Sequence, residues 1–257
     1  APQGPKSEGQ GFSGLARYRV MPVWVKGIFL TTNLTVIVLF IFHWFAIPIA
    51  GLVLSGTFYY YLLFALLGFN LFMGLPARRR QHGGPRWYDY TLGAILVGCL
   101  TYFLLNAHYI AMRGWEPPPS WIQLALAIVV CLVALEAGRR IGGWPYLMVI
   151  LVVGLYPLIA DRMPGVLFGF PISFPNIMAD FAYGANGLLG LPAQILGGMI
   201  LGYFFFAGTI VGLGGGEFFL RLATALMGRY RGGPAKVAVI ASAFLGSLSG
   251  QALTNIV

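Results

Sequence analysis

The sequence predicts an all-α membrane protein with about six transmembrane helices, an interfacial amphipathic helix and the start of a re-entrant helical hairpin. Three observations predict it. Hydrophobic residues make up 58% of the 257 residues and charged residues only 9%, whereas soluble domains are usually about 25% charged. Apolar runs of about 20 residues, long enough to cross a bilayer, recur along the chain. The 16 Lys and Arg residues gather in short clusters between these runs.

This composition excludes an ordinary water-soluble enzyme, because the excess apolar surface would cause aggregation in water. It also excludes a disordered chain, which needs low hydrophobicity. The net charge of +9 is compatible with nucleic-acid binding, but the cations lie between apolar runs, so we expect no nucleic-acid partner. Cys99 and Cys131 both lie inside apolar runs and are expected to be buried thiols without a disulfide or metal framework.

Residues 1–26 are polar and basic and contain several Gly and Pro residues, so they are expected to form a tail. After the tail, six apolar runs have about the length that crosses a ~30 Å hydrocarbon core. These runs are residues 27–49, 58–76, 91–112, 121–138, 144–160 and 193–213. Between the last two, residues 161–192 contain four prolines, which predicts an irregular extramembrane loop with a short helix.

The last part of the chain has a different pattern. Residues 217–231 combine apolar and basic residues at helical spacing, which predicts an interfacial helix on the membrane surface. Residues 235–250 form an apolar helix of only about 16 residues, which is too short to span comfortably. Its end at a Ser/Gly cluster, Gly246–Gly250, predicts a break at which the chain turns back within the membrane.

The positions of the cations predict the topology, because cytoplasmic loops hold most of the Lys and Arg residues of membrane proteins. With the N-terminus in the cytoplasm, 14 of the 16 cations fall on inner segments, and only Arg113 and Arg162 fall on outer ones. A missed or extra span would scramble this division. We therefore expect six spans with both ends of the chain inside.

The stretch Gly246–Asn255 contains the best candidate ligands. Ser247, Ser249 and Thr254 supply hydroxyls, and Asn255 supplies an amide oxygen. Transporters use broken membrane helices to present backbone carbonyls and helix ends to ions and substrates, and Na⁺ prefers oxygen ligands. The alternative is a packing surface of small residues whose hydroxyls bond their own helix. The sequence pattern leaves both interpretations open.

Four stretches of the second half resemble a known family. They are LEAGRR (135–140), GWPYL (143–147), GLLGLPAQILGGMILGYFFFAGTIVGLGGGEFF (187–219) and GRYRGGPAKVAVIASAFLGSLSG (228–250). On these residues the chain resembles the fused permease of tripartite ATP-independent periplasmic (TRAP) transporters, of the TAXI type. The resemblance implies a four-helix, small-permease-like domain over residues 27–140 and the beginning of the large transport domain over residues 141–257.

The resemblance implies a sodium-coupled, elevator-type importer in the bacterial inner membrane, which receives small organic anions from a periplasmic substrate-binding protein. It places Ser247, Ser249, Gly250 and Asn255 at the tip of the first re-entrant hairpin, as ion or substrate contacts. Gln251 and Thr254 replace the small residues that the family usually has at this tip, and the bulky amide of Gln251 is expected to obstruct an ion or substrate there. Na⁺ as the coupling ion is the only cofactor that the resemblance implies.

The family's transport domain has two inverted halves with one hairpin each, and this chain stops inside the first hairpin. We therefore expect either the N-terminal part of a longer permease or a truncated relative. A truncated relative would serve as a transport-inactive structural subunit of a larger complex, with other integral membrane subunits as partners. The reading frame after Val257 distinguishes the two.

Some polar residues lie within or beside the predicted spans. Glu136, Arg139 and Arg140 share a helix face, which predicts a membrane-edge ion pair that sets the topology; a functional Glu in the transport path is the alternative. His43 and His108 lie near the predicted outer ends of spans. Each histidine is expected to be hydrogen-bonded to a neighbouring residue. The alternative is that it ligates a pigment or haem or takes part in a proton relay.

Asn70 and Asn106 are expected to link helices by hydrogen bonds. Asn176, Asp180 and Asn186 lie in the outer loop, where they are solvated or meet a binding protein. Nothing in the sequence resembles a catalytic triad, a phosphate-binding loop or a zinc site, so we expect no enzyme.

Overall fold

The computed structural model describes residues 23–48, 54–77, 84–115, 118, 120–184 and 187–249. These ranges contain helices and no β-strand, which confirms the all-α class. Among the described residues, five helical segments are long and apolar enough to cross a bilayer: Val23–Trp44, Gly56–Gly74, Trp87–Leu105, Trp121–Leu158 and Leu191–Ile210. The chain divides into two compact units, and the boundary lies between Gly197 and Gly198.

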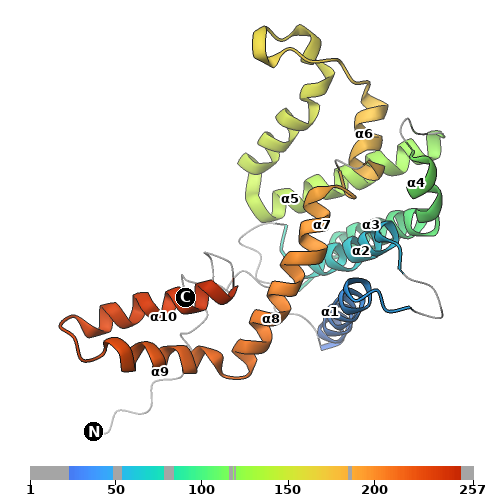
Figure 1. Ribbon diagram of the computed structural model, residues 1–257. Helices are drawn as coiled ribbons and strands as arrows, with labels where there is room; N and C mark the ends of the chain where they lie inside the picture. The colour runs from blue at the N-terminus through green and yellow to red at the C-terminus, as the bar shows by residue number, and fades with distance from the viewer. Residues whose placement is uncertain are drawn as a thin grey trace. The chain divides into compact units, whose positions relative to one another are not determined.

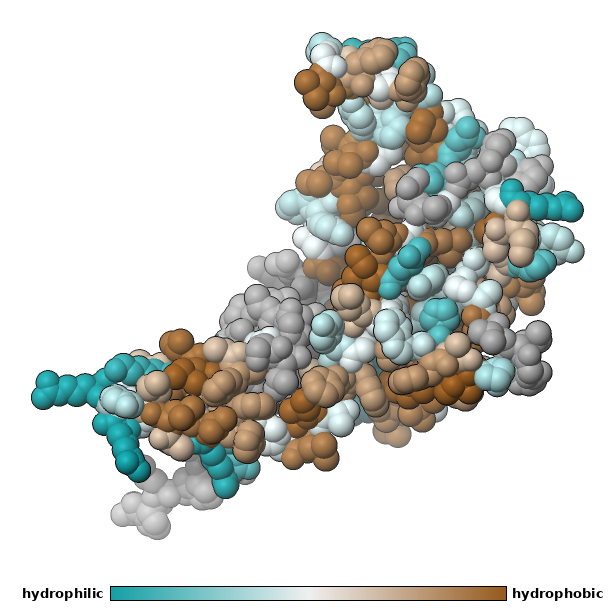
Figure 2. All heavy atoms as spheres, in the orientation of Figure 1, coloured by the Kyte–Doolittle hydropathy of each residue, from teal (hydrophilic) through white to brown (hydrophobic). Residues whose placement is uncertain are grey.

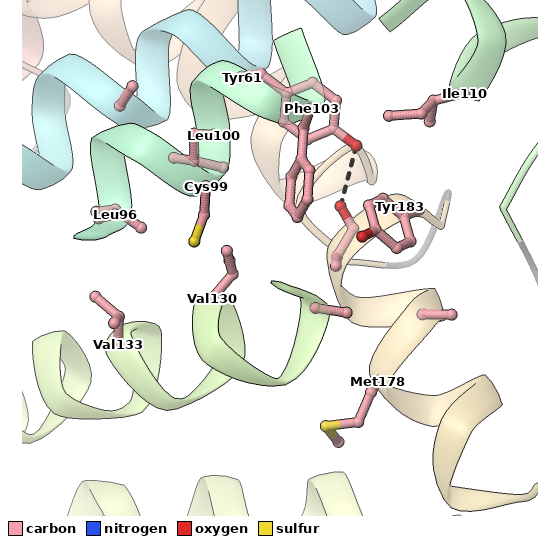
Figure 3. Close-up of a cluster of buried hydrophobic side chains, with 14 of the residues drawn as sticks. Tyr61, Leu96, Cys99, Leu100, Phe103, Ile110, Val130, Val133, Met178 and Tyr183 are labelled. Atoms are coloured by element: carbon pink, nitrogen blue, oxygen red, sulfur yellow. Dashed lines mark hydrogen bonds between the residues drawn. The ribbon is translucent and has the colours of Figure 1, made fainter. Parts of the chain in front are cut away.

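The first unit is a helical bundle, coloured from blue to orange in Figure 1. Its α-helices are α1 (Val23–Trp44), α2 (Gly56–Gly74), α3 (Trp87–Leu105), α4 (Ala107–Arg113), α5 (Trp121–Leu155), α6 (Phe174–Tyr183) and α7 (Leu191–Gln194). Its core is built around Tyr61 of α2, Phe103 of α3, Val130 of α5 and Tyr183 of α6, all of them buried (Figure 3). Because these side chains come from four different helices, burying them fixes the four helices against one another.

Helix α5 changes direction at Gly143. This residue has φ 81° and ψ −170°, which glycine adopts without steric cost, and Pro145 cannot donate a helical hydrogen bond. A Cβ atom on Gly138 would lie only 3.7 Å from Cδ1 of Ile150, although twelve residues of straight helix rise about 18 Å. The second part of α5 therefore folds back on the first, as the bend in Figure 1 shows.

This bend falls between the fourth and fifth predicted spans, 121–138 and 144–160. From Trp121 to Gly142 the helix rises about 33 Å, enough to cross the hydrocarbon core. Beyond the bend, α5 and a 3₁₀ turn, η2 (Tyr156–Leu158), add about 22 Å. The count of six spans stays a prediction, since residues Trp121–Leu158 qualify as one apolar segment with a bend inside it.

The third predicted span, 91–112, is not a single helix. α3 ends at Leu105, and Asn106, with φ −101° and ψ 9°, separates it from α4. The Asn106 Nδ2 atom donates to the carbonyl of Tyr102 at 2.9 Å, so its side chain competes locally with the backbone pattern of the helix. The segment of the predicted span 91–112 is therefore divided into two helices, and the expected interhelical role of Asn106 is wrong, because its amide bonds its own helix.

The segment between the fifth and sixth predicted spans contains the expected short helix, α6, after two further 3₁₀ turns, η3 (Ala160–Arg162) and η4 (Gly165–Leu167). α6 packs into the bundle, with Ile177, Met178 and Ala182 buried. The Tyr61 hydroxyl donates to the Ala182 carbonyl at 3.1 Å. The sequence predicted an irregular loop here and did not predict that part of it completes the core.

Tyr183, at the end of α6, closes this core. Its ring meets the ring of Phe103 at 4.8 Å and that of Trp115 at 5.1 Å, and its hydroxyl donates to the Gln123 carbonyl at 2.8 Å. Burial raises the pKa of the Tyr183 phenol above its usual value, and the nearby phenol of Tyr102 adds to the shift. The hydroxyl therefore stays protonated and remains a donor.

Replacing Tyr183 by Phe is expected to lower the free energy of unfolding by about 1 kcal/mol, because the Gln123 carbonyl loses its donor while the ring packing is kept. Denaturant unfolding in detergent micelles measures this change. Tyr109→Phe is the control, since Tyr109 is 56% exposed and its substitution should leave stability unchanged. Equal effects of the two variants would contradict the anchoring role of the Tyr183 hydroxyl.

A π-helical segment, η5 (Ile195–Ile200), follows α7 and leads into α8 (Leu201–Gly212). Together they make the apolar segment Leu191–Ile210, which confirms the sixth predicted span, 193–213, as a candidate membrane helix. The π-helical turn was not predicted. Such turns interrupt the regular backbone pattern and are frequent at functional sites.

The second unit contains α8, α9 (Gly215–Met227) and α10 (Gly233–Ser249). α9 turns sideways from the end of α8, and α10 returns alongside it (Figure 1). The rings of Phe219 and Phe244 approach to 5.7 Å, and Ala223 and Ala241 are buried. α9 corresponds to the interfacial helix predicted over 217–231, and α10 to the apolar helix predicted over 235–250.

Candidate functional site

The predicted hairpin tip lies at the limit of the described chain. α10 runs as one helix to Ser249, so the backbones of Ser247 and Ser249 belong to its last turns. Gly250, Gln251, Thr254 and Asn255 lie outside the described residues. The re-entrant hairpin and the role of these residues in ion or substrate binding therefore stay predictions.

Among the described residues, the most deeply buried charged side chains form a cluster in the first unit. Arg140 of α5 and Asp89 of α3 both have fully buried side chains, and the Arg140 Nη1 atom lies 2.7 Å from Oδ1 of Asp89. The Arg140 Nε atom donates to Oε1 of Glu136 at 2.9 Å. The predicted ion pair of Glu136 with its helix neighbours is thus confirmed, and Asp89 is an additional partner that the sequence did not reveal.

Arg139 completes the cluster from the same helix. Its Nε and Nη2 atoms both donate to the carboxylate of Glu136 at 2.7 Å, the two-pronged geometry that makes arginine–carboxylate bonds strong. The guanidinium groups also reach the chain beyond α2, where Arg140 donates to the Leu75 carbonyl at 3.2 Å and Arg139 to the Ala77 carbonyl at 3.3 Å. The cluster therefore ties α2, α3 and α5 together.

Asp89 is positioned by the start of its own helix. Its Oδ2 atom accepts the backbone N–H of Arg86 at 2.9 Å, the capping arrangement that satisfies a free donor at a helix N-terminus. The Arg140 guanidinium lies 4.9 Å from the ring centroid of Phe72, which adds a cation–π attraction. Both carboxylates of the cluster are occupied by arginines, so the geometry fits a structural clamp.

His43 and His108 have different surroundings. His43, at the end of α1, stacks on Tyr59 with ring centroids 3.9 Å apart and planes inclined by 11°. His108, in α4, is exposed and meets the neighbouring Tyr109 edge-on at 6.1 Å. Neither contact tests the pigment, haem or proton-relay hypotheses, which stay predictions.

Polar contacts also link α1 to α2. The Thr32 hydroxyl donates to Oδ1 of Asn70 at 2.7 Å, which confirms the predicted interhelical role of Asn70. Asn176 and Asp180 lie on α6, both partly buried, and Asn186 lies outside the described residues. Their contact with a binding protein stays a prediction.

A hydrogen bond and a close approach of α2 position the π-helical turn, and neither was predicted from the sequence. The Tyr59 hydroxyl donates to the Gly197 carbonyl at 2.6 Å, inside η5. A Cβ atom on Gly197 would lie 2.9 Å from Tyr60 and 3.1 Å from Leu63 and Tyr59. The absence of a side chain at residue 197 lets α2 approach the backbone closely, and nothing local in the sequence pairs residues so far apart.

Within the described chain no three His, Cys, Asp or Glu side chains come together in a way that could hold a metal ion. Cys99 and Cys131 are free thiols, the first buried and the second partly so. What the described residues offer is a set of apolar helices, a charged clamp that joins three of them, and an irregular helical turn within the last candidate span.

Comparison with known proteins identifies the family. The family model described as the tripartite ATP-independent periplasmic transporter, DctM component, matches residues 129–257. No curated protein and no solved structure matches the chain. The match begins within α5 and includes the bend at Gly143, η5 and the helices α8, α9 and α10. Because it covers half of the chain, this protein belongs to the family of TRAP transporter DctM components, which are multi-pass membrane proteins that work with other subunits.

Proposed function

We propose that this chain is part of a sodium-coupled membrane permease that imports small organic anions delivered by a periplasmic substrate-binding protein. The observation that carries the proposal is the family match over residues 129–257. The apolar helices supply the means to cross the bilayer. The TAXI type, the sodium coupling and the class of substrate are part of the proposal and rest on the resemblance of the 228–250 segment.

The proposed contacts are Ser247, Ser249, Gly250 and Asn255. Their support is chemical: hydroxyl and amide oxygens suit Na⁺, and a Ser/Gly turn leaves backbone carbonyls free for an ion. All four lie in the matched part of the chain. Gln251 brings a bulkier amide to the same stretch, and we expect it to restrict the size of the anion that can enter.

Uptake in proteoliposomes tests the proposal. The complete gene product is reconstituted, a periplasmic substrate-binding protein from the same cell is loaded with a labelled organic anion, and an inward Na⁺ gradient is imposed. We expect uptake that needs both the gradient and the binding protein. Ser249→Ala and Asn255→Ala should reduce it strongly, whereas Ser242→Ala, a serine on the same helix but away from the predicted tip, should not.

The opposite result has a clear meaning. Absence of uptake by the complete product under every gradient, combined with co-purification at fixed stoichiometry with other membrane subunits, would replace the permease proposal by the structural-subunit alternative. Uptake that continues when K⁺ replaces Na⁺ would overturn the sodium coupling alone.

A further inference from the structure

The turn between α9 and α10 carries a concentrated and uncompensated positive charge. Arg229, Arg231 and Lys236 are all exposed, and none of the three has an ion-pair partner among the described residues. The neighbouring Arg221 differs, since its Nη2 atom lies 2.5 Å from Oε1 of Glu217. We call Arg229, Tyr230, Arg231 and Lys236 the basic turn.

The geometry of the hairpin places the basic turn at one end. The Phe219–Phe244 contact, at 5.7 Å, joins the first half of α9 to the second half of α10, so the two helices run antiparallel and the turn lies at their far end. Figure 2 shows hydrophilic side chains gathered at this end and apolar ones along the helices. The Lys236 ammonium lies 5.5 Å from the Tyr230 ring, which holds the two side chains together.

The hairpin beside the turn has the surface of an interfacial element. Glu217 and Arg221 lie on the exposed side of α9, opposite the side on which Phe219 contacts α10 and Ala223 is buried. Large apolar side chains flank the two helices and are half or more exposed: Phe218, Leu220, Leu226 and Val239. A helix with one apolar face, one polar face and cations lies at the boundary between headgroups and acyl chains.

We propose that the basic turn binds the phosphate headgroups of anionic phospholipids at the membrane surface. Exposed apolar side chains and unpaired cations lie next to each other on one hairpin, and an anionic bilayer surface satisfies both at once. Arginine forks match phosphate oxygens, and tyrosine is favoured at the headgroup level. An acidic protein would satisfy the cations, but it would leave the flanking apolar residues without hydrocarbon.

Amide hydrogen exchange of the full chain in nanodiscs tests this proposal. One set of discs contains phosphatidylcholine alone, and the other contains phosphatidylcholine with phosphatidylglycerol. We expect the amides of residues 228–236 to exchange ~10-fold more slowly in the phosphatidylglycerol discs at low salt. The protection should decrease in high salt, because salt screens the attraction.

Three variants separate the effect of charge from an effect on folding. The triple variant Arg229→Gln, Arg231→Gln, Lys236→Gln should lose the protection that phosphatidylglycerol confers, and Arg229→Lys, Arg231→Lys should keep most of it. The double variant Arg113→Gln, Arg162→Gln removes two exposed arginines elsewhere in the chain and should leave the protection intact. Free inorganic phosphate added to phosphatidylcholine discs should not reproduce it.

Equal exchange rates in the two kinds of disc would overturn the proposal, as would protection that survives in the triple glutamine variant. Protection by inorganic phosphate alone would assign the basic turn to a soluble anion in place of a lipid. None of these outcomes depends on transport, so the test stands apart from the proposed permease function.

Discussion

Replacing Asp89 by Ala is expected to lower the free energy of unfolding by about 3 kcal/mol, because the buried Arg140 guanidinium loses its buried carboxylate and keeps the partly exposed Glu136 at 2.9 Å. The Arg140 side chain is fully buried and bonds Asp89 at 2.7 Å, so water cannot compensate for the lost carboxylate. The substitution also removes the acceptor for the backbone N–H of Arg86. Unfolding of the purified protein in detergent, followed by circular dichroism, measures the change.

The exposed pair Glu217–Arg221 provides a matched control, because it joins the same two kinds of charge on the surface of α9. Glu217→Gln should cost no more than about 1 kcal/mol. The double variant Asp89→Leu, Arg140→Met removes both buried charges and should be more stable than Asp89→Ala, since Glu136 remains paired with Arg139 at 2.7 Å. Similar losses for Asp89→Ala and Glu217→Gln would show that the cluster does not hold the bundle together.

Replacing Gly197 by Ala is expected to destabilise the protein by about 1–3 kcal/mol, because the new methyl group would be overpacked. It would meet Tyr60 at 2.9 Å and Tyr59 and Leu63 at 3.1 Å. The Tyr59 hydroxyl would have to withdraw from the Gly197 carbonyl, which it meets at 2.6 Å. The same unfolding measurement reports the loss.

Gly208→Ala is the control for this prediction. Gly208 lies within α8, and a Cβ atom there would meet nothing within 4 Å. Alanine should therefore be neutral or stabilise the helix by up to about 1 kcal/mol. If both glycine variants behave alike, α2 and the π-helical turn are not in close contact in solution.

Hydropathy and charge predicted the helices well, because both depend on local composition. The apolar runs 27–49 and 58–76 became α1 and α2 with ends shifted by a few residues. The amphipathic pattern of residues 217–231 became α9. The boundary predicted between the spans 121–138 and 144–160 coincides with the bend in α5, where Gly143 and Pro145 act on their own backbone.

The features that the sequence did not predict depend on contacts of side chains within the folded protein, mostly between residues far apart in the chain. Asp89 was overlooked because its partner Arg140 is 51 residues away, and no local pattern pairs them. Residues 174–183 looked like part of a loop because their burial is supplied by other helices. Asn106 was misassigned because its amide bonds its own helix instead of a neighbouring one. For the predicted ion contacts around Ser249, the sequence remains the basis of the assignment.

The charged clamp has a consequence for how this polypeptide can be divided. The family match starts at residue 129, yet the bridge from Asp89 to Arg140 and the ring contact between Phe103 and Tyr183 both cross that point. Cleaving the chain between α4 and α5 would give two fragments. Each fragment would expose apolar side chains of the shared core and one member of the Asp89–Arg140 ion pair. A version of this protein encoded by two separate genes would have to rebuild the same patch as a tight heterodimer contact.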